Sequence, residues 1–126
     1  MMLRLTLLIT LFLSSSLAFS SNAINAYAVS IFDENKNEEK VQGIQKTVHD
    51  YNGVVYTKIY AFGTFLHDQP NVNIGNSKGE LVEERPIVKN NRLIGYEMLF
   101  KHRTVQSGYV EVYIGKKLFN RSVYVK

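Results

Sequence analysis

A chain of 126 residues with no cysteine and a formal net charge of +4 has room for one domain, which must be stable without disulfides. The absence of cysteine excludes thiolate metal sites, thiol redox centres and a lipid-modified N-terminal cysteine. The charge is modest and the basic residues are scattered among acidic ones, which argues against a nucleic-acid-binding protein.

The N-terminal segment has the three-part layout of a secretory signal peptide. A short basic start, Met1 to Arg4, precedes an apolar run from Leu5 to Leu13 and then a stretch of small and polar residues. The apolar run is shorter than the roughly 20 residues that cross a bilayer. We therefore expect export, and no permanent membrane anchor.

Two positions match the small-x-small pattern of a signal cleavage site, after Ala18 and after Ala23. Cleavage after Ala23 is favoured, which assigns residues 1–23 to the signal peptide and residues 24–126 to a single β-rich domain. The net charge then falls to +3, because Arg4 is removed with the signal peptide. The expected location is a periplasm or the extracellular medium.

Alternation of apolar and polar residues predicts strands along most of this domain. Residues 24–32 are expected to form the first strand. Weaker patterns predict strands at 41–48 and 80–88, with Pro86 placing the latter at an edge of the sheet. A short helix between residues 38 and 49 competes with the strand at 41–48.

The middle of the chain combines a strongly apolar segment with a polar one. Residues 54–66 are β-branched and aromatic on both faces, which is typical of a central strand buried on both sides, with a possible bend at Gly63. Residues 68–79 contain Pro70, two glycines and three asparagines, which predict a long, mobile loop.

The C-terminal region has the clearest pattern. Residues 93–102 alternate and predict a half-buried strand with Ile94, Tyr96, Met98 and Phe100 inward. Two further alternating runs, 108–114 and 117–125, are joined by Gly115-Lys116, as in a type II′ hairpin. Arg121 would fall on the apolar face of this hairpin, a conflict that a β-bulge would remove.

Six or seven strands separated by turn residues in about 100 residues predict an all-β fold. The favoured architecture is an antiparallel β-sandwich of the immunoglobulin-like kind. The alternative is an α+β fold with one helix on an antiparallel sheet.

Histidine and carboxylate side chains raise the question of a metal site. His49-Asp50 and His67-Asp68 are two such pairs, and His102 is a third imidazole. The pairs flank the strand predicted at 54–66, whose ends lie roughly 40 Å apart if it is straight. We therefore expect the pairs in turns and expect no metal and no other cofactor.

No residue set in the chain predicts catalysis. There is neither a Gly-x-Ser-x-Gly elbow nor a phosphate-binding glycine loop. The acidic cluster of Glu80, Glu83 and Glu84 stands beside Arg85 and Lys89, which is typical of a solvated edge with local ion pairs. The protein is not expected to be an enzyme.

Tyrosine is unusually frequent, with eight in the chain, and it is common in protein contact surfaces. One group, Tyr56, Tyr60 and Phe62, shares a face of the strand at 54–66. On the outer face of sheets, tyrosines also form ordinary cross-strand pairs. The interpretation that these tyrosines have only this structural role stays open. The residues predicted to bind a partner are Tyr109, Tyr113 and Tyr124 of the C-terminal hairpin, with Lys116 of its turn and Lys117, which follows the turn.

The stretch from Met98 to Val123 resembles the sheet portion of the accessory factor of curli secretion. The similarity rests on Phe100-Lys101-His102-Arg103, Ser107-Gly108, Val110–Ile114 and Leu118-Phe119-Asn120. The resemblance implies a small periplasmic protein that helps to send amyloid subunits through an outer-membrane pore. His102-Arg103-Thr104 lacks the proline of the corresponding family turn, and no functional residue is carried over.

Export, a compact β domain and tyrosine-bearing faces predict a non-enzymatic protein-binding domain, such as an accessory or assembly factor at the cell envelope. Its expected partner is another protein, not nucleic acid. One alternative is a small-ligand or metal-binding exported protein that uses His49, His67 and His102. Another is a fibre or pilus-like structural subunit in which residues 24–32 form an exchanged strand.

Overall fold

The computed structural model describes residues 22–65 and 68–126, and this part of the chain forms an all-β fold. It contains no helix, and therefore none that could cross a membrane. The predicted signal peptide lies, up to residue 21, outside the described residues. Asn22 and Ala23, which precede the favoured cleavage position, already belong to the first strand.

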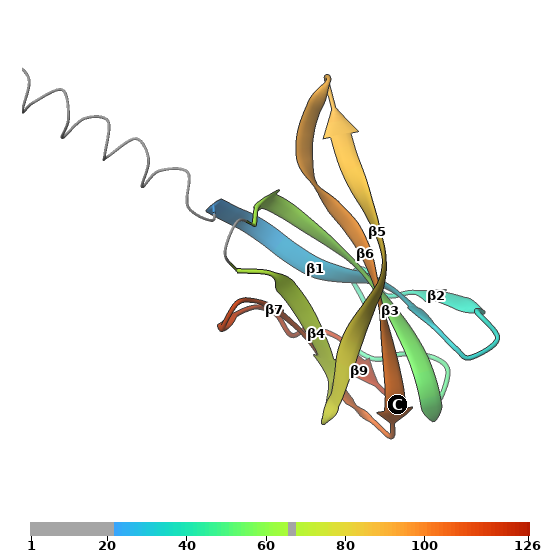
Figure 1. Ribbon diagram of the computed structural model, residues 1–126. Helices are drawn as coiled ribbons and strands as arrows, with labels where there is room; N and C mark the ends of the chain where they lie inside the picture. Colours follow the sequence, from blue (N-terminus) through green and yellow to red (C-terminus); the bar gives the residue numbers. More distant parts are fainter. Residues whose placement is uncertain (1–21, 66–67) are drawn as a thin grey trace, which may run out of the picture.

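The strands form one antiparallel sheet that folds over on itself (Figure 1). They pair in the order β2-β1-β3-β6-β5-β4-β7-β8, and β9 pairs with β7. Their bounds are β1 Asn22–Phe32, β2 Glu38–Lys40, β3 Gly53–Thr64, β4 Pro70–Ile74, β5 Ser77–Lys89, β6 Arg92–Val105, β7 Gly108–Ile114, β8 Lys117–Asn120 and β9 Tyr124–Val125.

Strand β5 connects the two halves of the sheet. Ser77 and Lys78 pair with β4, whereas the residues from Gly79 to Lys89 pair with β6. Because the sheet turns over at this point, β4 comes close to β6, and β7 and β8 come close to β1. Beyond Lys78, β5 has no partner on its second side within the described chain, so the predicted edge position of Pro86 is confirmed.

The apolar core lies between the two halves. Its fully buried side chains include Ile31, Val55 and Ile59 from one half and Val72 and Val110 from the other. Burying each such side chain contributes roughly 1.5–3 kcal/mol. The core is therefore the main source of stability in a protein that has no disulfide.

These pairings confirm the predicted all-β class and its antiparallel sheet. The α+β alternative is not supported, because residues 22–65 and 68–126 contain no helix. The strands follow one hydrogen-bonded path rather than two separate sheets, so the immunoglobulin-like detail is not confirmed.

Residues 41–48 form neither the predicted strand nor the competing helix. Strand β2 ends at Lys40, and the chain then turns around the buried carboxylate of Glu39. This carboxylate accepts hydrogen bonds from the N–H groups of Val48 and His49, at 2.7 and 3.2 Å, and from the Tyr51 hydroxyl at 3.0 Å. Burial raises the pKa of Glu39, but the three hydrogen bonds outweigh it and hold this pKa below its usual value.

The predicted mobile loop at 68–79 is instead mostly sheet. Strand β4 pairs with β7 from Pro70 opposite Ile114 to Ile74 opposite Val110. Gly75, with φ +56°, then turns the chain directly into β5. The asparagines point away from the core, whereas Val72 and Ile74 are fully buried.

The C-terminal hairpin and its bulge are confirmed, but the second strand, predicted at 117–125, is interrupted at residues 121–123, between β8 and β9. Ile114 pairs with Lys117 across a turn in which Gly115 has φ +61°, as the first position of a type II′ turn requires. The register shifts at Phe119, and Arg121 thereby turns outward to an ion pair with Glu111 at 3.4 Å. Inward-facing residues of β7 and β9 are buried as predicted: Val110, Val112, Ile114 and Val125.

The strands predicted at 24–32, 54–66 and 93–102 correspond to β1, β3 and β6. Met98 and Phe100 are buried, while Ile94 and Tyr96 are half-buried. Strand β3 is central, but only one of its faces is fully buried. The expectation of burial on both sides is wrong, and the half-exposed second face of β3 is the centre of the candidate site.

Candidate functional site

Strands β1, β3, β6 and β5 present a face that points away from the core. Because side chains alternate along a strand, the register between these strands places four rows of residues across this outer face. The rows are Asn25-Phe62-Gly95-Ile87, Tyr27-Tyr60-Glu97-Arg85, Ser30-Lys58-Leu99-Glu83 and Phe32-Tyr56-Lys101-Glu80.

Aromatic rings cover one end of the outer face. The ring centroids of Tyr27 and Tyr60, and of Tyr60 and Phe62, lie 6.1 Å apart in nearly perpendicular pairs. Such pairs contribute about 0.5–1.5 kcal/mol beyond the area they bury. Gly95 lies beside Phe62, and a Cβ there would come within 3.0 Å of the ring and 2.3 Å of the Ala61 carbonyl oxygen. Glycine therefore allows the close approach of β3 and the Phe62 ring to β6 at this point.

Three hollows follow β6 along the outer face, and we call them together the outer trough. The first lies between Phe62 and Ile87, and it shares Arg85 and Glu97 with the second. The second is lined by Phe32, Lys36, Tyr56 and Lys58 among others. The third, of about 530 Å³, shares no residue with the second. It begins at Glu80 and Lys101, in the same row as Tyr56, and continues past Arg103 to Lys78.

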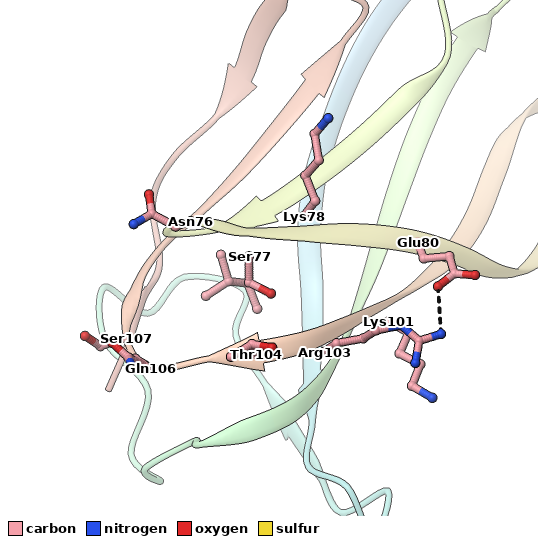
Figure 2. A pocket seen from close by; sticks show the side chains of 10 residues that line it. Asn76, Ser77, Lys78, Glu80, Lys101, Arg103, Thr104, Gln106 and Ser107 are labelled. Carbon is pink, nitrogen blue, oxygen red and sulfur yellow. Dashed lines mark hydrogen bonds and ion pairs between the residues drawn. The ribbon is translucent and has the colours of Figure 1, made fainter.

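The third hollow is the cationic end of the trough. Figure 2 shows Lys101 and Arg103 reaching in the same direction, with Arg103 paired to Glu80 at 3.2 Å, while Lys78 extends away from them. Polar side chains of Asn76, Gln106 and Ser107 complete the rim. Of the predicted acidic cluster, Glu83 forms the local ion pair with Arg85, at 2.8 Å, whereas Glu80 pairs with Arg103 of the neighbouring strand. Within the described residues Glu84 forms no ion pair.

Beneath this end, His102 is fully buried and connects three strands. Its Nδ1 donates to the Ser77 carbonyl at 3.1 Å, and its Nε2 accepts from the Thr57 hydroxyl. Burial lowers the pKa of His102 to about 4, although the bond to Ser77 opposes this. The imidazole is therefore neutral at physiological pH.

The three histidines considered for a metal site are not all brought together. His49 is exposed on the loop after β2, both ring nitrogens of His102 have protein partners, and His67 lies outside the described residues. Within residues 22–65 and 68–126, no group of three histidine, aspartate or glutamate side chains could hold a metal ion.

The residues predicted to bind a partner fall into two groups. Tyr109 and Tyr124 stack edge to face at 5.2 Å, with the Arg121 guanidinium 4.5 Å from the Tyr109 ring. Tyr113 lies about 13 Å further along β7, next to the turn that contains Lys116 and leads to Lys117, the first residue of β8. Tyr109 and Tyr113 share the outward face of β7, and their role in binding a partner stays a prediction.

Sequence reasoning placed Tyr56, Tyr60 and Phe62 on one face of β3, and the register confirms this. It missed the contribution of β6, where Glu97, Leu99 and Lys101 alternate with buried residues along the same outer face. It also missed Lys36, which reaches the trough from the β1–β2 turn.

Comparisons with protein-family models, with curated proteins and with solved structures each find no match for this chain. The resemblance to the curli accessory factor stays a prediction.

Proposed function

We propose that this protein is an exported, non-enzymatic protein-binding domain, an accessory or assembly factor at a cell envelope, and that its outer trough contacts the partner. The observation that supports this function is the half-exposed face of β3 and β6, where aromatic rings stand beside arginine and lysine side chains. Aromatic residues and arginine are the types that concentrate binding energy in protein interfaces.

The fibre-subunit alternative receives less support from the position of β1. This strand pairs with β2 and β3, and Ala26, Ala28 and Ile31 on its inner face belong to the core. Withdrawing it to complete another subunit would open that core. The metal-binding alternative is weakened because His102 is buried and its ring nitrogens are engaged.

Truncation of Tyr60 is expected to weaken partner capture. The change removes the central ring of the aromatic group, and a tenfold loss of affinity corresponds to about 1.4 kcal/mol. Immobilised wild type, Tyr60→Ala and Tyr113→Ala would each be exposed to native envelope extract, with thermal unfolding as the check on folding. We expect Tyr60→Ala to lose capture of the partner, and wild type and Tyr113→Ala to retain it. Loss with Tyr113→Ala and not with Tyr60→Ala would place the contact on the C-terminal hairpin.

A further inference from the structure

Two lysines without a carboxylate partner stand on either side of Tyr56. The Nζ atom of Lys36 lies 6.0 Å from the centre of the Tyr56 ring, and Lys101 lies directly opposite Tyr56 in the register of β3 and β6. Within the described residues neither lysine forms an ion pair, whereas each carboxylate that lines the trough does. The pairs are Lys58 with Glu97 at 3.6 Å, Arg85 with Glu83 at 2.8 Å, and Arg103 with Glu80 at 3.2 Å.

The outer trough consequently has a positive charge of its own. Its lining contains three more cationic than acidic side chains, and the three without an ion pair are Lys36, Lys78 and Lys101. This excess equals the whole net charge of the described residues, because the total is +4 and Arg4 lies outside them. Lys78 extends away from Lys101 (Figure 2), so Lys36 and Lys101 are the pair that one ligand segment could contact together with Tyr56.

We infer that the outer trough binds an extended acidic segment of the partner protein, with an aromatic side chain next to its carboxylates. This inference rests on the proposed function and names the chemistry of its partner. Carboxylates of the segment pair with Lys36 and Lys101, and its ring packs against Tyr56 and Leu99. Charge-assisted hydrogen bonds of this kind are stronger than neutral ones, and complementary charge selects partners and speeds association.

The probe that tests this chemistry is a random copolymer of glutamate and tyrosine. Binding of the exported protein to the copolymer, to polyglutamate and to heparin would be measured by calorimetry at low and moderate salt. We expect the copolymer to bind more tightly than polyglutamate, and its affinity to fall as salt screens the charges. Tighter binding of heparin than of the copolymer would overturn the inference in favour of an anionic polysaccharide. The absence of copolymer binding would also overturn it.

A pair of charge-matched variants locates the contact. Lys36→Gln/Lys101→Gln should weaken copolymer binding about tenfold or more. Lys46→Gln/Lys89→Gln removes the same charge at exposed positions outside the trough and should weaken copolymer binding less than about twofold. Equal losses would show that only net charge matters and would overturn the inference. The copolymer could fail to bind while Tyr60→Ala still abolishes capture of the partner from native envelope extract. In that case the inference of an acidic ligand is wrong, and the proposed function stands.

Discussion

Replacing Phe100 by alanine is expected to lower the free energy of unfolding by about 3 to 5 kcal/mol, the usual cost of deleting a buried phenylalanine ring. Phe100 is 2 % exposed and lies in the core opposite Thr57 of β3 and Leu81 of β5. Its removal would leave a cavity between the two halves of the sheet, where no disulfide restrains the chain.

Urea unfolding of wild type and Phe100→Ala measures this loss directly. Leu118→Ala is the matched control, because this side chain is 44 % exposed on β8 and its truncation should cost no more than about 0.5 kcal/mol. A loss below about 1 kcal/mol for Phe100→Ala would show that the inward face of β6 has been misassigned.

Stability is expected to fall by about 2.5 kcal/mol between about pH 7.5 and about pH 4.5 through His102 alone. In the folded protein burial lowers the pKa of His102 to about 4, against an ordinary value of 6.5. The unfolded chain therefore binds more protons than the folded one in this window. The contribution of His102 to the free energy of unfolding is complete above the pKa that this side chain has in the unfolded chain. It is lost progressively as the pH falls toward 4.

Urea unfolding of His102→Asn across the same pH range isolates the contribution of His102 to the pH dependence of stability. The variant is expected to be less stable at neutral pH, because the hydrogen bond to Thr57 is lost, but its stability should vary less with pH. Wild type and His102→Asn both retain Glu39 and the groups around it, so its protonation at the acid end cancels in the comparison. The same pH dependence in His102→Asn and wild type would contradict the assignment to His102.

The fold was predictable from sequence where one face of a strand is buried. Alternation identified β1, β6 and the C-terminal hairpin, since a shift by one residue would have exposed the whole apolar face. It failed at 41–48, where the only β-pairing is an isolated bridge from Lys46 to Tyr124, and the Glu39 carboxylate binds the next N–H groups, of Val48 and His49. It failed at 68–79 because Asn71 and Asn73 are typical turn residues, whereas here they are the outward positions of β4.

The candidate site was less predictable, because it depends on which strands are neighbours. Tyr56 and Tyr60 share a face by local alternation, but Lys101 comes opposite Tyr56 only through the pairing of β3 with β6. Bulges add a second obstacle. Tyr109 and Tyr124 are adjacent because the register of the hairpin shifts at Phe119 and the chain returns as β9. Neither pairing can be deduced from residue spacing alone.

Photo-crosslinking in the native cell envelope tests the proposed contact surface most directly. A photoreactive residue would replace Leu99, which lines the trough between Lys58 and Glu83. The same residue in place of the exposed Leu118 on the C-terminal hairpin is the control. We expect a discrete crosslinked partner protein from position 99 and none from position 118. A partner crosslinked from position 118 alone would contradict the assignment of the outer trough as the binding surface.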